Sequence, residues 1–107
     1  MARKQKPKFE VTCVLGKRIS VTASYWRKII RFKHPALAGK EAQVQQTLTD
    51  ADEVRESKAD STVKLYYRFY GTAHLCVVSK HLNNEGFVIT AYFTDRIKEG
   101  VTIWTKS

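Results

Sequence analysis

The fold of this chain follows from residues 63–94, which read VKLYYRFYGTAHLCVVSKHLNNEGFVITAYFT. Three β-rich runs are separated there by two turn signals, one at Gly71-Thr72 and one at residues 83–86. We therefore predict an antiparallel meander with strands at residues 63–70, 75–80 and 87–94.

Side chains alternate along these strands, as expected for a sheet with two different faces. The apolar face is expected to carry Val63, Leu65, Tyr67, Phe69, Phe87, Ile89, Ala91 and Phe93. The opposite face is expected to carry Lys64, Tyr66, Arg68, Tyr70, Val88, Thr90, Tyr92 and Thr94. The apolar face needs a cover of helices, so chemistry is expected on the opposite face.

The residues before Val63 must supply that cover. Alternating side chains over residues 9–14 and 18–22 predict a small hairpin. Apolar spacing predicts helices over residues 23–31 and 39–48. On the first of these helices, one face is expected to hold Tyr25, Ile29 and Phe32.

The predicted fold class is α+β, with two N-terminal helices, after a small β-hairpin, packed on one face of a three- or four-stranded antiparallel sheet. Residues 49–54 are expected to add a helical turn, residues 55–60 a polar connection and residues 101–104 a last edge strand. We expect residues 1–8 to be a basic flexible tail and residues 9–107 a single domain. The expected core consists of Trp26, Ile29, Val44, Leu48, Leu65, Val77, Ile89 and Phe93.

The positive charge is concentrated near the N-terminus. The formal net charge is +9, and residues 1–33 hold ten Lys and Arg against one acid, Glu10, whereas residues 34–107 hold nine of each sign. A one-sided basic surface indicates a polyanionic partner, most simply RNA or DNA. The alternative is a solubilising tail with scattered surface lysines.

The two cysteines, Cys13 and Cys76, both lie in apolar runs, which predicts buried free thiols. Neither has a neighbour at metal-ligand spacing, and no cofactor is expected. No apolar run reaches the length of a membrane span and no signal peptide is visible. We therefore expect a cytoplasmic protein without a membrane partner.

Several segments of the sequence resemble those of a family of small bacterial and phage-related proteins. They are YWRKIIRFKHP (25–35), TLTDADEVRESKAD (47–60), LYYRFYG (65–71), LCVVSK (75–80), EGFVITAYFTDRIKEG (85–100) and IW (103–104). That family is identified as a member of the BECR superfamily, the ribonuclease fold of barnase, EndoU, the colicin tRNases and RelE-type toxins. The resemblance runs from Phe9 to Trp104, and Ala51 departs from it where a proline is expected.

The resemblance implies a metal-independent, toxin-like endoribonuclease that cleaves RNA through a 2′,3′-cyclic phosphate. Such cleavage needs a base for the ribose 2′-OH, a cation for the charged phosphorane and an acid for the leaving 5′-oxygen. It also implies RNA as the partner and, for a toxin, an antitoxin or immunity protein.

The candidate catalytic residues are His34, Arg55, Ser57, Thr90 and Tyr92. Histidine titrates near neutrality, which suits an acid or base, although His34 can equally serve as a cap for the first helix. The resemblance places Arg55 at the mouth of the site as a phosphate clamp, against the alternative of a solvated loop arginine.

Tyrosines beside a cation suit the stacking of unpaired bases and the neutralisation of a phosphate. The candidate nucleic-acid-binding residues are Arg3, Lys4, Lys6, Lys33, Tyr66, Arg68, Lys80 and Lys98. The alternative is an exposed sheet face of ordinary β-formers with solvated lysines.

Two other functions remain open at this point. One is a non-catalytic RNA- or DNA-binding module on the same fold. The other is a protein-interaction domain that uses the open sheet edge for strand addition. No paired carboxylates, P-loop, GxSxG or GxGxxG motif suggests a different enzyme class.

Overall fold

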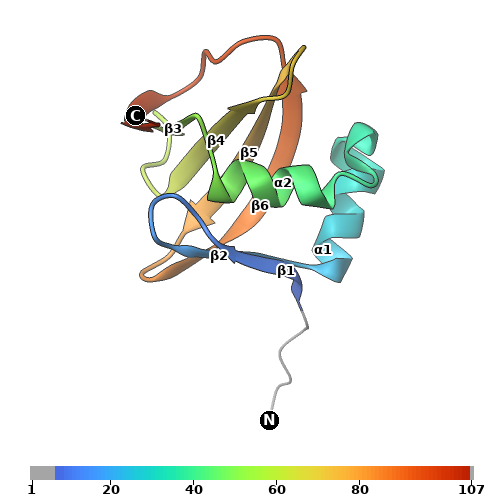
Figure 1. Cartoon of the computed structure of the whole chain (residues 1–107). Helices are drawn as coiled ribbons and strands as arrows, with labels where there is room; N and C mark the ends of the chain where they lie inside the picture. The colour runs from blue at the N-terminus through green and yellow to red at the C-terminus, as the bar shows by residue number, and fades with distance from the viewer. Residues whose placement is uncertain (1–6, 107) are drawn as a thin grey trace.

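A computed structural model of the chain describes residues 7–106. The fold is α+β (Figure 1). In chain order the elements are β1 (Pro7–Thr12), β2 (Arg18–Thr22), α1 (Ala23–Lys28), the π-helical turn η1 (Ile29–Lys33), the 3₁₀ turn η2 (Pro35–Leu37), α2 (Glu41–Thr49), β3 (Glu53–Glu56), β4 (Val63–Phe69), β5 (His74–His81), β6 (Glu85–Thr94) and β7 (Val101–Thr105).

The prediction of a three- or four-stranded antiparallel sheet with two N-terminal helices is wrong. A seven-stranded mixed sheet runs in the order β1-β2-β6-β5-β4-β3-β7, and the two α-helices, α1 and α2, are short. The meander β4-β5-β6 is antiparallel as predicted, but it forms only the middle of this sheet.

Two segments enlarge the sheet. The predicted hairpin β1–β2 exists, but β2 also pairs in parallel with the start of β6, through Arg18 to Glu85 and Ser20 to Phe87. Residues 53–56, expected to be helical or a polar connection, form β3 between β4 and β7. Only Val54 of this strand is buried. Because the residues beside it are charged, the sequence pattern did not indicate a strand inside the sheet.

Both α-helices cover one face of the sheet, and α2 crosses the strands of the meander (Figure 1). The main core lies between them, and the predictions for Trp26, Ile29, Val44, Leu48 and Val77 are confirmed. Within the described part of the chain, no helix is long and apolar enough to cross a membrane.

The predicted assignment of faces is wrong for β4. Tyr66 pairs with Val77 and joins the main core under the helices, whereas Leu65 and Tyr67 face the other side. A bulge at Ile89 shifts the register of β6, because Val78 pairs with Thr90 while Ser79 pairs with Val88.

Two further core predictions fail on β6. Ile89 lies at the bulge and is half-buried, and Phe93 is 39% exposed. The pairing of β2 with β6 ends at Ser20 and Phe87, so no strand pairs with the rest of this β6 edge and Phe93 lacks a full cover. Leu65 is buried as predicted, but on the face without helices.

The first helix changes geometry after Lys28. The N–H of His34 donates to the carbonyl of Ile29 at 2.8 Å, the i→i+5 bond of a π turn. This turn breaks the predicted stripe, because Ile29 remains buried while Phe32 is 74% exposed. It also delivers His34 to the free edge of β6.

Candidate functional site

The face of the sheet opposite α1 and α2, which we call the helix-free face, carries two rows of side chains. Each row crosses four strands, from β3 through β4 and β5 to β6. One row consists of Arg55, Leu65, Val78 and Thr90, and the other of Glu53, Tyr67, Cys76 and Tyr92. Three of the five predicted catalytic residues therefore belong to this one face.

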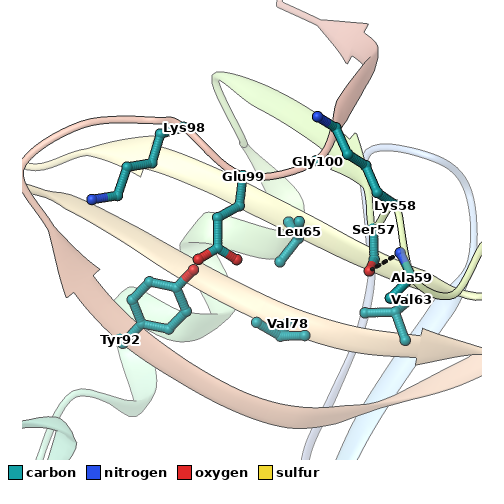
Figure 2. Close-up of a pocket in the computed structure, with 10 residues that line it drawn as sticks. All are labelled: Ser57, Lys58, Ala59, Val63, Leu65, Val78, Tyr92, Lys98, Glu99 and Gly100. Carbon is teal, nitrogen blue, oxygen red and sulfur yellow. Dashed lines mark hydrogen bonds between the residues drawn. The ribbon is translucent and has the colours of Figure 1, made fainter.

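A pocket of about 520 Å³ opens on the helix-free face (Figure 2). Leu65 and Val78 form its floor, Tyr92 lies on the side of β6, and Ser57 lies on the side of β3. The remaining lining residues come from the connections after β3 and before β7 and from β4: Lys58, Ala59, Val63, Lys98, Glu99 and Gly100. Three predicted site residues, Ser57, Tyr92 and Lys98, thus meet at one pocket.

The hydroxyl of Tyr92 is hydrogen-bonded to Cys76 on the neighbouring strand β5. Cys76 lies between Tyr67 and Tyr92 across the three strands and shares side-chain hydrogen bonds with both hydroxyls. Burial raises the pKa of the Tyr92 hydroxyl, and the Cys76 sulfur raises it further. Burial also raises the pKa of the Cys76 thiol to about 11. The Tyr92 hydroxyl therefore remains protonated and is available as a donor of a proton or a hydrogen bond.

Glu99 is the acidic residue of this pocket. Figure 2 shows its carboxylate directed toward the Tyr92 hydroxyl, and its charge adds to the rise in the Tyr92 pKa. Lys98 and Lys58 flank it on the two sides of the opening. The pocket therefore combines two cations, one carboxylate, a tyrosine and a serine above an apolar floor.

His34 reaches Tyr92 from the other side. The two rings lie 5.9 Å apart between centroids, with their planes inclined by 37°. Both residues line a second pocket of about 360 Å³, together with Lys33, Leu37 and Phe93 at the free edge of β6. Tyr92 therefore belongs to both pockets and joins His34 to the helix-free face.

Arg55 and Thr90 stand at opposite ends of their row. Three strand spacings separate them, which corresponds to roughly 14 Å. The Nε of Arg55 pairs with Glu53 at 2.7 Å, and its Nη1 donates to the carbonyl of Gly100 at 3.4 Å. Arg55 thus supports the segment before β7 and is not among the residues that line the pocket.

The carboxylate of Glu53 neutralises part of the charge of Arg55. Burial raises the pKa of its carboxyl, but hydrogen bonds from Thr102 and Arg55 outweigh burial and the pKa is lowered overall. The Thr90 hydroxyl, in contrast, is buried and has no hydrogen-bond partner among the described residues.

The predicted nucleic-acid-binding residues do not form one surface. Tyr66 is buried, where its hydroxyl contacts Cys13 Sγ at 3.0 Å and His81 Nε2 at 2.9 Å. Arg68 lies on the helix side of the sheet and pairs with Asp50 at 3.2 Å. These two positions follow from the reversed faces of β4.

The other predicted cations have varied surroundings. Lys80 pairs with Asp60 at 3.2 Å, and Lys33 donates to Tyr25 and to the carbonyl of Ile89. Lys98 lines the large pocket. Arg3, Lys4 and Lys6 lie outside the described residues.

Sequence reasoning missed Lys58 and Glu99, because nothing in a loop sequence shows which side chains fold back over a sheet. It also counted Arg27, Lys28 and Arg31 only as net charge and did not predict that Phe32 is exposed beside them. Among residues 7–106, no three His, Cys, Asp or Glu side chains gather as a metal site.

Comparison with family models, curated proteins and solved structures finds no match to this chain.

Proposed function

We propose that this protein is a metal-independent endoribonuclease that cleaves RNA through a 2′,3′-cyclic phosphate. One observation carries the proposal: His34 packs against Tyr92, and Tyr92 also lines the pocket that holds Ser57 and Lys98. These four residues come from separate segments of the chain and converge on one edge and face of the sheet. The resemblance of several sequence segments to a family assigned to the BECR superfamily supports the same activity.

The proposed reaction requires no external reagent. A base removes the proton of the ribose 2′-OH, and the 2′-oxygen attacks the adjacent phosphorus. The bond between phosphorus and the 5′-oxygen then breaks, and an acid protonates that oxygen. We assign His34 as the base, because histidine can accept a proton near neutral pH.

Tyr92 suits the acid side of this reaction. Its raised pKa keeps the hydroxyl protonated, so it can donate to a phosphate oxygen or to the leaving 5′-oxygen. Lys58 and Lys98 at the rim are the cations available to the charged phosphorane. Arg55 acts on the pocket indirectly, because its hydrogen bond to the carbonyl of Gly100 holds that segment in place.

A second candidate is a non-catalytic RNA-binding module. The ion pair between Arg55 and Glu53 favours it, because a catalytic arginine needs its charge for the phosphate. Glu99 favours it as well, because an acidic side chain in the pocket repels a phosphate. For either function, we infer that RNA is the ligand and the cytoplasm the compartment.

The test is cleavage of a 5′-labelled single-stranded RNA by purified protein in the presence of EDTA. A DNA oligonucleotide of the same sequence controls for the need for a 2′-OH. The expected product carries a 2′,3′-cyclic phosphate, identified by mass spectrometry. The double variant His34→Ala/Tyr92→Phe, purified in parallel, controls for contaminating ribonucleases.

Three results would reject the catalytic proposal: no cleavage of any RNA, cleavage that EDTA abolishes, or equal cleavage by the double variant. RNA binding without cleavage would select the binding module. Growth arrest on expression, relieved in the double variant, would extend the proposal to a toxin.

A further inference from the structure

A basic helical surface lies apart from the pocket, on α1 and η1. We define it by Arg27, Lys28, Arg31 and Phe32, all of which are exposed. The ion pairs among the described residues involve other cations: Lys8, Arg18, Arg55, Lys64, Arg68, Lys80 and Lys106. The three cations of this surface therefore have no carboxylate partner within residues 7–106, and their charge is available to a ligand.

Phe32 is the unusual member of this surface. It is 74% exposed, more than any other large apolar side chain that the structure describes. The Arg31 guanidinium lies 5.5 Å from the centre of its ring. The ring borders a groove of about 470 Å³ that is also lined by Arg27, Lys28, Ile30 and Arg31.

A purely solvated helix face does not account for this arrangement. A lone exposed ring would need no explanation, but Phe32 borders a groove lined by cations and carries a guanidinium over its ring. An apolar partner surface does not account for it either, because Arg31 lies over the ring and Arg27 and Lys28 line the same groove. A ligand with both a planar apolar group and negative charge satisfies both features.

The basic helical surface continues into the candidate site. The π turn that exposes Phe32 ends at Lys33, and the next residue, His34, contacts Tyr92. Lys33, His34 and Phe93 line the second pocket, which lies between the helix and the β6 edge. A strand bound along η1 therefore arrives directly at Tyr92.

We propose that the basic helical surface binds the single-stranded segment of RNA that flanks the cleavage site. One unpaired base stacks on Phe32, and its neighbouring phosphates contact Arg27, Lys28 and Arg31. This inference rests on the proposed function for the nature of the ligand. The binding itself can be measured without any cleavage.

The probe is a fluorescein-labelled RNA oligonucleotide with 2′-O-methyl groups throughout, which cannot form a cyclic phosphate. Binding is measured by anisotropy between 50 and 300 mM KCl. The test variant is Arg27→Gln/Lys28→Gln/Arg31→Gln. The matched control is Lys8→Gln/Arg18→Gln/Lys106→Gln, which removes the same charge from cations that are paired with Glu41, Glu10 and Asp50.

The test variant is expected to bind more weakly and to lose about 2 units of the log–log salt slope, since each phosphate contact to a single strand contributes about 0.7. The control variant is expected to keep the wild-type slope. Equal slopes for the two variants would overturn the inference, because binding would then follow net charge alone.

Phe32 distinguishes single-stranded RNA from other polyanions. Phe32→Ala is expected to weaken binding of the probe by about 5- to 100-fold with no change of slope, because it removes stacking and no charge. The same substitution is expected to leave binding of an RNA duplex unchanged. Equal losses for both would show that Phe32 only maintains the helix.

Poly-L-glutamate tests for an acidic protein as the ligand. This polymer carries negative charge but no bases, so we expect it to compete only weakly with the RNA probe. Its competition should be equally weak for the wild type and for Phe32→Ala. Competition as strong as that of the RNA would assign this surface to an acidic protein partner and overturn the RNA inference.

Cleavage assays separate this inference from the proposed function. If the probe behaves as expected but the wild type cleaves no RNA, the surface is an RNA-binding site and the ribonuclease proposal fails. If the wild type cleaves RNA and the test variant binds and cleaves like the control, the ribonuclease proposal stands and this inference fails.

Discussion

The imidazole of His34 lies 5.9 Å from the ring of Tyr92, at 37° to it, although the two residues are 58 positions apart in the chain. The π turn η1 brings His34 to this position, and the incomplete pairing of β6 with β2 leaves the edge free to receive it. Both irregularities of the fold therefore serve one contact. In the proposed reaction, this contact places a base beside an acid.

His34→Ala and Tyr92→Phe are each expected to lower kcat/KM for RNA cleavage by about 100- to 10,000-fold, the usual contribution of one proton-transfer group. Tyr92→Phe keeps the ring that packs against His34 and removes only the hydroxyl. His34→Ala is also expected to flatten the pH profile of kcat near neutrality. The measurements are initial rates between pH 5 and pH 9, with circular dichroism to confirm folding.

His74→Ala is the matched control, because His74 packs against Phe69 at the start of β5, 5.0 Å between ring centroids, and does not line either pocket. It is expected to cleave RNA like the wild type. Cleavage by His34→Ala within threefold of the wild-type rate would show that the base is another residue.

Two neighbours in the pocket, Lys98 and Glu99, are expected to act in opposite directions. Lys98→Gln removes a cation and should weaken binding of the 2′-O-methyl RNA by about two- to fivefold, whereas Glu99→Gln removes a repelling carboxylate and should tighten it by a similar factor. The measurement is anisotropy at 50 mM KCl. Changes of the same sign would mean that RNA does not enter this pocket.

Gly100 supports the segment that carries Lys98 and Glu99 over the sheet. Its φ is +85°, and a Cβ there would lie 2.8 Å from the carbonyl oxygen of Glu56 and 2.9 Å from Leu65 Cδ1. Gly100→Ala is therefore expected to lower the free energy of unfolding by about 2 kcal/mol or more beyond the strain of a positive φ. Urea unfolding measures this loss.

Gly71→Ala is the control for that strain, because Gly71 has a φ of +87° with nothing within 4 Å of its added Cβ. It is expected to lower the free energy of unfolding by about 1 kcal/mol. Equal losses for the two variants would show that the overlap at Gly100 is relieved by a small shift. Cleavage should fall only in Gly100→Ala, because only that change displaces the pocket.

The sequence predicts the middle of the sheet well, because alternation and turn residues are local signals. β4 and β5 begin and end within one residue of the predicted positions, and β6 only begins earlier, at Glu85. Their faces could not be predicted with the same success. Tyr66 and Tyr67 are both buried, one on each side, so hydrophobicity does not indicate which side carries the helices.

Long-range pairing explains the larger error in the fold. β2 pairs in parallel with residues more than 60 positions away, and no local pattern announces such a partner. β3 has one buried side chain in four, so its sequence resembles a polar loop. Both segments become strands because the neighbouring strands leave hydrogen-bonding edges that must be satisfied.

The candidate site was partly predictable for the same reason. Thr90 and Tyr92 share a face because they lie two positions apart on one strand, and both follow the bulge at Ile89. Lys58 and Glu99 were not predictable, because their position depends on how two loops cross the sheet. Phe32 was placed on the same helix face as Tyr25 and Ile29, because a regular α-helix was expected where the chain forms a π turn.

His81 makes the stability of the fold depend on pH. The ring is 9% exposed and its Nε2 lies 2.9 Å from the Tyr66 hydroxyl. Burial, with the charges of Lys64 and Lys17, lowers the pKa of His81 from 6.5 to about 4. The folded chain therefore holds this histidine neutral, while the unfolded chain takes up a proton below pH 6.5.

The free energy of unfolding is accordingly expected to be constant above about pH 6.5 and to fall as the pH decreases toward 4, by about 2 kcal/mol at pH 5 relative to pH 7. His81→Gln should lower stability at pH 7, because it disturbs the contact with Tyr66, but it should remove most of this pH dependence. His74→Gln should retain it. Urea titrations at pH 7, 6 and 5 measure all three proteins, and a slope in His81→Gln equal to that of the wild type would assign the pH dependence to a different group.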